Sequence, residues 1–188
     1  KYSWHTNLFF VICNIHYTTN IKWKSNYTMN SFRLIELFLE LANIDGISGN
    51  EKGVANYIKN FLINLGYSVE EDSASEFTNS NTNNLICKIG DGGNFVMLSH
   101  MDTARPTKNL RPIILEDKIV SSGDTVLGVD NRSGIAVLLF TLEKISKEKI
   151  STKNFTVGFT TCEETTLFGS KYLGIDKKIN HAFIFDSG

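Results

Sequence analysis

Apolar residues recur at helical spacing in two stretches of the chain and predict two amphipathic helices. The first helix is expected over residues 31–44, with Ser31 as its N-cap and an apolar stripe made of Phe32, Ile35, Phe38, Leu39 and Ala42. The second lies within residues 48–66 and has a stripe made of Val54, Tyr57, Ile58, Phe61, Leu62 and Leu65. Ser48 and Glu51 have the spacing of a capping box, and Gly66 stands where the helix should end.

Shorter apolar runs, bounded by glycine, asparagine and aspartate, predict strands and further helices. Strands are expected at 67–72, 84–90, 94–100, 154–161 and 181–186, with a loop over 73–84 and a glycine-rich turn at 90–94. Residues 111–122 predict a hairpin whose tip is Glu116–Lys118. Helices are expected over 167–174 and over 131–145, the latter with an apolar face of Ile135, Leu138, Leu139 and Leu142. Strands that alternate with helices indicate a layered α/β domain.

Composition and charge narrow the function classes. The chain has 188 residues, 41% of them hydrophobic and 21% charged, and its formal net charge is −1. No Lys/Arg-rich run suggests a nucleic-acid or membrane-surface partner, and no apolar run approaches the roughly 20 residues of a membrane span. Three widely spaced cysteines without C-x-x-C spacing favour a reducing compartment, hence the cytoplasm, over a disulfide framework or a cysteine zinc site.

The first 28 residues differ from the rest of the chain. They contain one short apolar patch, Leu8 to Cys13, among many Asn, Thr and aromatic residues, and they lack a clear signal-peptide pattern. Met29 is the first methionine, and helical periodicity begins directly after it. We expect residues 1–28 to be a non-native or disordered leader and residues 29–188 to form the folded part of the chain.

Ionisable side chains gather at the ends of the predicted strands. His100 and Asp102 follow an apolar strand, and their i, i+2 spacing lets both project from one face. Glu163 and Glu164 follow the strand at 154–161, and Asp186 ends the strand at 181–186. Asp130 follows the run "TVLGV" and precedes a helix. In open α/β sheets, the carboxyl edge of the strands is where sites are built, so we expect these residues to converge.

The expected cluster has the chemistry of a metal site. One imidazole with several carboxylates and no thiolate suits Zn²⁺, Mn²⁺ or Co²⁺. So many gathered carboxylates would repel one another, whereas two divalent ions remove that repulsion and can share one carboxylate. Two such ions can activate a water, and a carboxylate that binds no metal can accept its proton. The adjacent Glu163 and Glu164 suggest one base and one ligand, although their spacing does not say which is which.

Four ordered motifs carry a resemblance to a known family. They are "SHMDTA", "SGDTVLGVDNRSG", "TTCEETTLFG" and "AFIFDSG". They resemble the dinuclear zinc exopeptidase superfamily that includes peptidase T, carboxypeptidase G and the aminoacylases, and most of all the peptidase T-like proteins. The resemblance covers residues 29–188 and implies that they are the N-terminal portion of a metallopeptidase catalytic domain. It implies a three-layer α/β/α sandwich around a mixed, mostly parallel sheet that is incomplete at its C-terminal end, without the lid or dimerisation domain and the final catalytic segment.

The resemblance also implies a role for each residue of the cluster. His100 and Asp186 would bind one zinc ion and Glu164 the second, with Asp130 bridging both. Asp102 would orient the His100 imidazole, and Glu163 would be the general base. A cis peptide between Asp130 and Asn131 is a further implication.

The sequence departs from the family pattern in two ways, one in a loop and one at the second metal. The family usually has glycine where this chain has Thr166, so the local loop is expected to differ if positive φ is needed there. In the family, a histidine from much later in the chain also binds the second metal. None of the other histidines before Gly188, which are His5, His16 and His181, fits that role. His181 begins a strand that Asp186 ends, and we interpret it as structural. We interpret Cys162 as a packed thiol, and Arg105 and Arg111 as solvated loop residues in preference to ligands of a substrate carboxylate.

The resemblance to peptidase T-like proteins therefore implies a cytoplasmic, two-zinc aminopeptidase that acts on short peptides with a free N-terminus. An N-acyl amino acid deacylase or a carboxypeptidase of the same superfamily is the alternative within enzymes. The non-enzymatic alternative is an inactive fragment that only binds metal. The resemblance further implies an intact protein that forms homodimers through the missing domain. No nucleic-acid or membrane partner is expected.

Overall fold

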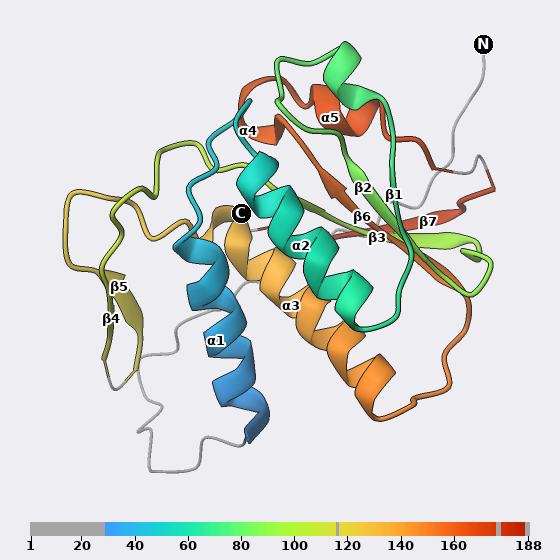
Figure 1. Cartoon of the computed structure of the whole chain (residues 1–188), viewed down its shortest axis with the longest axis horizontal. Coiled ribbons are helices and arrows are strands. Elements are labelled where there is room, and N and C mark those ends of the chain that lie inside the picture. The colour runs from blue at the N-terminus through green and yellow to red at the C-terminus, as the bar shows by residue number, and fades with distance from the viewer. Residues whose placement is uncertain (1–28, 116, 176–177, 187–188) are drawn as a thin grey trace.

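The computed structural model describes residues 29–115, 117–175 and 178–186 (Figure 1). The predicted leader at residues 1–28 and the hairpin-tip residue Glu116 lie outside the described residues. Within the described part of the chain, no helix is long and apolar enough to cross a bilayer.

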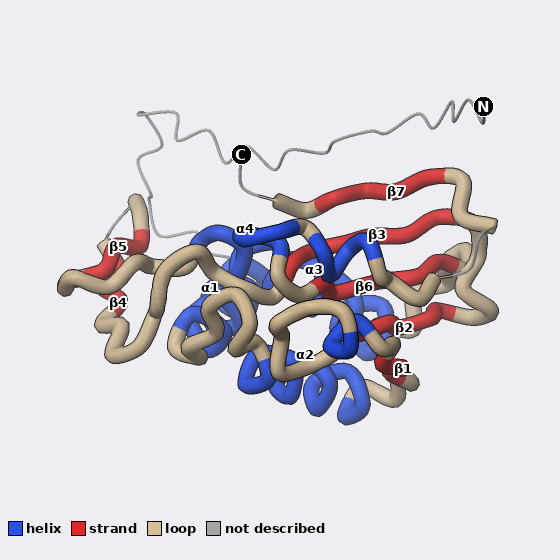
Figure 2. The backbone as a smooth tube through the Cα atoms, turned by 90° about the horizontal axis from the view of Figure 1, so that it is seen from above, coloured by secondary structure: helices blue, strands red, loops and turns tan. Residues whose placement is uncertain are grey.

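Among the described residues, five strands form one mixed sheet in the order β1 (Val69–Glu71), β2 (Leu85–Ile89), β6 (Phe155–Thr160), β3 (Phe95–His100) and β7 (His181–Ile184), side by side in Figure 2. β6 runs parallel to β3, and β3 parallel to β7, whereas β2 is antiparallel to both of its neighbours. Four of these five strands therefore run in one direction, as expected. The turn at 90–94 links β2 and β3, which are not paired to each other, because β6 lies between them.

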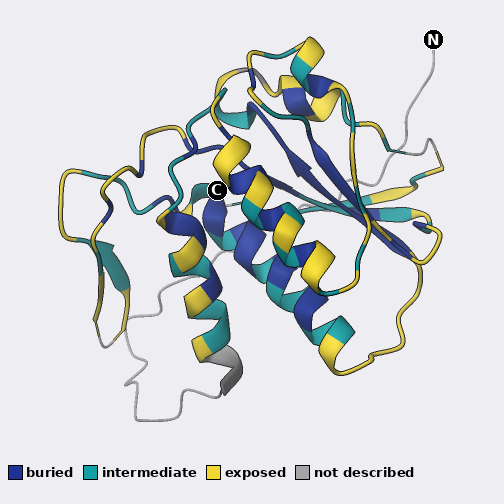
Figure 3. Cartoon of the chain, viewed as in Figure 1, coloured by how far each residue is buried: buried dark blue, intermediate teal, exposed yellow. Residues whose placement is uncertain are grey.

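Three long helices pack over one face of this sheet. They are α1 (Met29–Ala42), α2 (Lys52–Asn64) and α3 (Val129–Lys147), and α3 contacts both of the others (Figure 1). Their apolar side chains join alternate residues of β2 and β6 in one core, and the two strands are largely buried (Figure 3). The predicted apolar face of α3 is confirmed, because its four residues, Ile135, Leu138, Leu139 and Leu142, are all buried.

A shorter segment covers part of the opposite face of the sheet. It contains α5 (Phe168–Lys171) and Leu173, and a Cβ added to Gly158 of β6 would touch both Leu98 and Leu173. Gly174 lies against Ile86 on the same side. The sheet thus has helices on both sides, which agrees with the expected layered α/β fold.

The stripe predicted for the first helix is right only in part: Ala42 is fully buried and Phe38 packs against the core, but the most buried positions include two residues outside the stripe. Leu37 and Leu41 are fully buried, whereas Phe32 is 56% exposed. Helix α1 carries apolar residues on more than one side, so its sequence is compatible with two different buried faces. Contact with α3 selects the face that carries Leu37 and Leu41.

The predicted capping box at Ser48 and Glu51 is wrong. Helix α2 begins at Lys52, and Glu51 at the N-cap makes no capping hydrogen bond with its side chain. Both side chains turn instead toward the segments that follow β3 and β6. The predicted apolar stripe is borne out at Val54, Ile58 and Leu62, which are buried.

Strands β4 (Pro112–Ile114) and β5 (Ile119–Ser121) form the predicted hairpin as a separate antiparallel pair, which stands apart from the main sheet in Figure 1. Two short helices complete the described elements: the 3-10 helix η1 (Ala74–Glu76) within the expected loop, and α4 (Glu163–Thr166) after β6.

Candidate metal centre

Three parallel strands deliver most of the candidate residues to one edge of the sheet. β3 ends at His100, β6 ends shortly before Glu163 and Glu164, and β7 ends shortly before Asp186. Because these strands are parallel, their carboxyl ends meet at the same edge. Asp130 arrives differently, from the first turn of α3, where Asp130 and Asn131 have non-helical backbone angles.

The structure places the other four expected ligand and base residues, Asp130, Glu163, Glu164 and Asp186, around the His100 ring. His100 Nε2 lies 2.9 Å from Asp130 Oδ1, 3.4 Å from Asp186 Oδ1 and 3.9 Å from Glu163 Oε2. Donor atoms of His100, Asp130 and Asp186 lie within 4.8 Å of one another, and so do those of His100, Glu163 and Glu164. The sequence-based expectation that these distant residues meet therefore agrees with the geometry.

Asp102 lies behind this cluster and contacts three of its members. Its carboxylate is fully buried, and Oδ1 lies 3.3 Å from His100 Nδ1. The backbone N–H groups of Glu163 and Glu164 donate to Asp102 Oδ1 and Oδ2, each at 3.0 Å. The hydroxyl of Ser48 also donates to Oδ2. Asp102 thus contacts the imidazole, whose Nδ1 also lies 3.1 Å from the Asp102 backbone carbonyl oxygen, and it accepts from the backbone of both glutamates.

The electrostatics of the cluster favour a positive charge at its centre. Burial opposes protonation of His100, but hydrogen bonds with Asp102, Asp130 and Asp186 outweigh it and raise the pKa of the ring to about 12. Burial likewise opposes ionisation of Asp102, and its bonds with His100 and Ser48 lower its pKa to about 2. Burial and neighbouring carboxylates raise the pKa of Glu163 and of Glu164.

A divalent cation fits these residues. The donors are one imidazole nitrogen and several carboxylate oxygens, which suit Zn²⁺, Mn²⁺ or Co²⁺. A bound cation would supply the positive charge that the metal-free cluster draws from a protonated His100. His100 is almost fully buried, while Asp130, Glu163 and Asp186 have between 30% and 45% of their side chains exposed. The cluster thus lies at the surface edge, where a substrate can reach it.

The turn that carries Asp130 is anchored to the end of β7. The Asp130–Asn131 peptide is cis, as predicted. The buried Asn131 side chain donates to the carbonyl of Phe185 at 2.6 Å and accepts from the N–H of Gly134 at 3.1 Å. Asn131 therefore holds Asp130 against the residue that precedes Asp186.

Two buried charged residues that support the site were not anticipated from the sequence. Glu51 accepts from the N–H groups of Gly49 at 2.9 Å and Cys162 at 3.0 Å, and from the hydroxyl of Ser80 at 2.6 Å. Arg132 donates to the backbone carbonyls of Met101, Ile44 and Gly46. The only signal for Glu51 was its position in "SGNE", which also fits a capping box.

The residues around Glu163 and Glu164 show how the loop accommodates Thr166. Thr166 belongs to α4, and positive φ occurs at the flanking Cys162 and Leu167.

Cys162 is a buried thiol, as interpreted, and burial beside Glu51 raises its pKa to about 11. His181 is exposed at the amino end of β7, the end opposite Asp186.

The chain is similar to known peptidases in sequence and in fold. The model of peptidase family M28 matches residues 84–187. A tripeptidase from Staphylococcus aureus is 34% identical, with a TM-score of 0.76 over 84% of this chain and 43% of its own. The aminopeptidase PepT from Bacillus cereus is 29% identical, with a TM-score of 0.74 over 83% of this chain and 43% of its own.

A curated relative of another specificity is also similar. Carboxypeptidase G2 from a Pseudomonas strain is 32% identical over 149 residues, which are 74% of this chain and 34% of that protein. The chain thus spans between one third and two fifths of the length of the curated relatives that it matches. The family match covers more than half of the chain and includes every candidate residue, so the chain belongs to peptidase family M28.

Proposed function

We propose that the protein hydrolyses peptide bonds of short peptides at a free N-terminus, with two zinc ions as its cofactors. The observation that carries this proposal is the convergence of His100, Asp130, Asp186, Glu163 and Glu164 at one sheet edge. Membership in a peptidase family supports hydrolysis, and the likeness to a tripeptidase and to PepT favours short peptides.

Each residue of the cluster receives a role in this proposal. His100 and Asp186 would hold one ion, Glu164 the other, and Asp130 both. When bound, the ions would polarise the scissile carbonyl and lower the pKa of a water. Glu163 would accept the proton of that water and pass it to the leaving amine. Its raised pKa and partial exposure suit a group that must gain and lose a proton near the substrate.

Asp102 would act by positioning. Its carboxylate lies beside His100 Nδ1, and the metal would bind the other ring nitrogen, Nε2. The carboxylate also accepts hydrogen bonds from the N–H groups of Glu163 and Glu164, so it would fix the base relative to the metal ligands. A change at Asp102 would therefore disturb both metal binding and proton transfer.

Carboxypeptidase or N-acyl amino acid deacylase activity is the second candidate. The similarity to carboxypeptidase G2 favours it, because that enzyme shares the matched region. The non-enzymatic alternative is a chain that binds metal but does not turn over substrate. Its basis is that the late histidine expected for the second metal is not among the residues of this cluster. Homodimerisation and a cytoplasmic location remain predictions.

The test combines metal titration with a substrate panel. The chain is incubated with Zn²⁺, Co²⁺ or Mn²⁺ and offered tripeptides with free or acetylated N-termini. The proposal predicts metal-dependent turnover of the free tripeptides, lost in Glu163→Gln. Turnover of the acetylated set alone would establish the deacylase or carboxypeptidase alternative, and metal binding without any turnover would leave a binding role.

A further inference from the structure

Arg132 follows Asp130 by two residues and lies where separate segments of the chain meet. Its side chain is fully buried. Its guanidinium donates to the backbone carbonyls of Ile44 at 3.3 Å, of Gly46 at 3.5 Å, and of Met101. Arg132 therefore joins the loop after α1, the end of β3 and the first turn of α3.

The contact with Met101 is the one that reaches the candidate metal centre. Met101 is fully buried and lies between His100 and Asp102 in the chain. Its N–H donates to the carbonyl of Thr160 at the end of β6, at 2.7 Å, and its carbonyl accepts from the Arg132 guanidinium. Met101 is thus held by β6 through its N–H group and by the first turn of α3 through its carbonyl.

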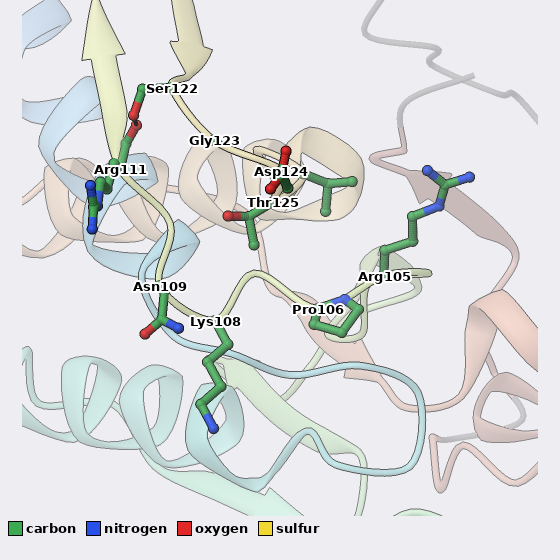
Figure 4. A pocket seen from close by; sticks show the side chains of 10 residues that line it. Arg105, Pro106, Lys108, Asn109, Arg111, Ser122, Gly123, Asp124 and Thr125 are labelled. Carbon is green, nitrogen blue, oxygen red and sulfur yellow. Dashed lines mark hydrogen bonds between the residues drawn. The ribbon is translucent and has the colours of Figure 1, made fainter.

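Thr107, which is fully buried, lies at the same junction. Its hydroxyl donates to a carbonyl of the loop after α1 at 3.3 Å, and an added Cβ on Gly128 would lie 2.9 Å from its methyl group. The two loops that leave the junction, residues 105–111 and 122–126, line a cavity of about 490 Å³ (Figure 4). Arg132 is not among the described residues that line this cavity, so it would act through the backbone and not by touching a substrate there.

Stability alone does not account for a charged side chain at this place. Moving a charge out of water is costly, and apolar side chains can often replace buried charged groups without loss of stability. The Nε–H of Arg132 has no acceptor among the described residues, which adds to the cost. The carboxylates of Asp45, Glu51 and Asp102 attract the charge and offset part of it. An arginine is suited to this place because its planar fork of donors can fix several carbonyls at once.

We propose that Arg132 is a positioning residue, which fixes the Asp130 carboxylate relative to the His100 imidazole through the Met101 carbonyl. His100 Nε2 lies 2.9 Å from Asp130 Oδ1. Because Met101 directly follows His100 and Arg132 lies close to Asp130 in the chain, the bond between Arg132 and Met101 closes a short circuit around the two ligands. The inference rests on the proposed function, which makes these two residues metal ligands, and adds a residue that would touch neither metal nor substrate.

The test compares the wild type with Arg132→Met and Arg132→Lys. The metal-free chains are titrated with Co²⁺, and the visible absorption of the bound ion reports the geometry of its ligands. Circular dichroism establishes which variants are folded. Arg132→Met should bind Co²⁺ about tenfold more weakly than the wild type and change the absorption, because its side chain cannot hold the Met101 carbonyl. Arg132→Lys, whose ammonium group still donates, should restore part of both.

Arg33→Met is the matched control, because it removes an ion pair of 2.9 Å between α1 and α3. It should lower stability but leave the affinity for Co²⁺ and the absorption unchanged. Gly46→Ala is a second test that keeps the charge, since its Cβ would lie 2.9 Å from Arg132 Nη2 and displace the guanidinium. It should change the absorption, whereas Gly53→Ala, whose Cβ would lie 3.1 Å from the side chain of Ile44, should not.

Wild-type affinity and absorption in both Arg132→Met and Gly46→Ala would overturn the inference, and so would an equal change in Arg33→Met. If Arg132→Met does not fold, unchanged Co²⁺ binding in Arg132→Lys and Gly46→Ala would overturn it.

Turnover of a tripeptide by the zinc-loaded chains separates this inference from the proposed function. Turnover by the wild type, together with unchanged Co²⁺ binding in the variants, would keep the function and reject the role of Arg132. Altered Co²⁺ binding in the variants of a wild type that hydrolyses no tripeptide would keep the role of Arg132 and reject the function. A wild type that binds no Co²⁺ would reject both.

Discussion

The carboxylate of Asp102 accepts a hydrogen bond from the backbone N–H of Glu164 at 3.0 Å, although 62 residues separate them in the chain. The same carboxylate accepts from the N–H of Glu163 and lies against the ring of His100. One buried group therefore sets the position of the imidazole at the end of β3 relative to both acids that follow β6. Because its three partners are all candidate site residues, Asp102 is the natural place to test how the site is organised.

Replacing Asp102 with asparagine should weaken zinc binding about 10- to 100-fold, because the amide keeps the size of the side chain but loses its charge. Isothermal titration of the metal-free chain with Zn²⁺ measures the effect. Asp117→Asn is a suitable control, since Asp117 is an exposed residue of the β4–β5 hairpin. Equal zinc affinities of Asp102→Asn and the control would show that Asp102 does not organise the metal ligands.

Substitutions of the two adjacent glutamates should have different effects on zinc content and on turnover. Glu163→Gln should retain zinc but lose about 10²- to 10⁴-fold in kcat for a tripeptide, as expected for removal of a general base. Glu164→Gln should instead lower the amount of bound zinc. Elemental analysis and turnover are measured on the same samples. The opposite outcome, loss of zinc in Glu163→Gln alone, would exchange the two roles.

The stability of the metal-free chain should fall at low pH through Asp102. Its pKa is about 2 in the folded chain, against an ordinary value of 3.8. Its contribution is therefore present above about pH 4 and is lost as the pH falls through about 2, and it amounts to about 2 kcal/mol. Urea unfolding at pH 5 and pH 2.5 in the presence of a chelator measures the loss. Asp102→Asn should show a smaller drop, and an identical drop would assign the acid sensitivity elsewhere.

Removing the Glu51 carboxylate should destabilise the fold by about 3 kcal/mol, because the N–H groups of Gly49 and Cys162 and the hydroxyl of Ser80 would lose their acceptor while buried. Urea unfolding of Glu51→Ala measures this loss of unfolding free energy. Glu51→Gln should lose less, since its amide oxygen can still accept from both N–H groups. Similar losses in the two variants would mean that packing, not hydrogen bonding, is the main contribution of Glu51.

Much of the fold could be predicted from the sequence where local pattern and final environment agree. The strand at residues 94–100 was found because it is a short continuous apolar run beside a glycine-rich turn, and the apolar face of α3 because its apolar residues recur at helical spacing. The burial pattern of α1 was missed, because apolar residues lie around most of that helix and only the contact with α3 selects a face. The position of β6 between β2 and β3 was missed for a similar reason, since strand order depends on contacts distant in the chain.

Some residues of the site could also be predicted from the sequence, and others could not. His100, Asp102 and the glutamate pair could be proposed because they follow strands whose carboxyl ends meet. Asp130 was included because it follows the apolar run at 125–129, but that run forms no strand, and Asp130 reaches the cluster from the first turn of α3. Ser48 and Glu51 fit a helix cap locally, but their side chains bond to Asp102 and Cys162 instead. A local motif cannot reveal a partner that only the tertiary fold brings near.

The most direct test is the zinc content of the chain after equilibrium dialysis against Zn²⁺, compared with that of His100→Ala. His100 is the residue shared by both candidate ligand groups, so its loss should empty the site that it forms with Asp186, and Asp130 and Glu164 alone supply too few ligands to retain an ion through dialysis. The wild type should retain at least about one zinc ion per chain, as expected for a site of one imidazole and several carboxylates, and His100→Ala should retain almost none. A wild-type chain that retains no zinc, or a His100→Ala chain that retains as much as the wild type, would contradict the assignment of this cluster as a metal centre.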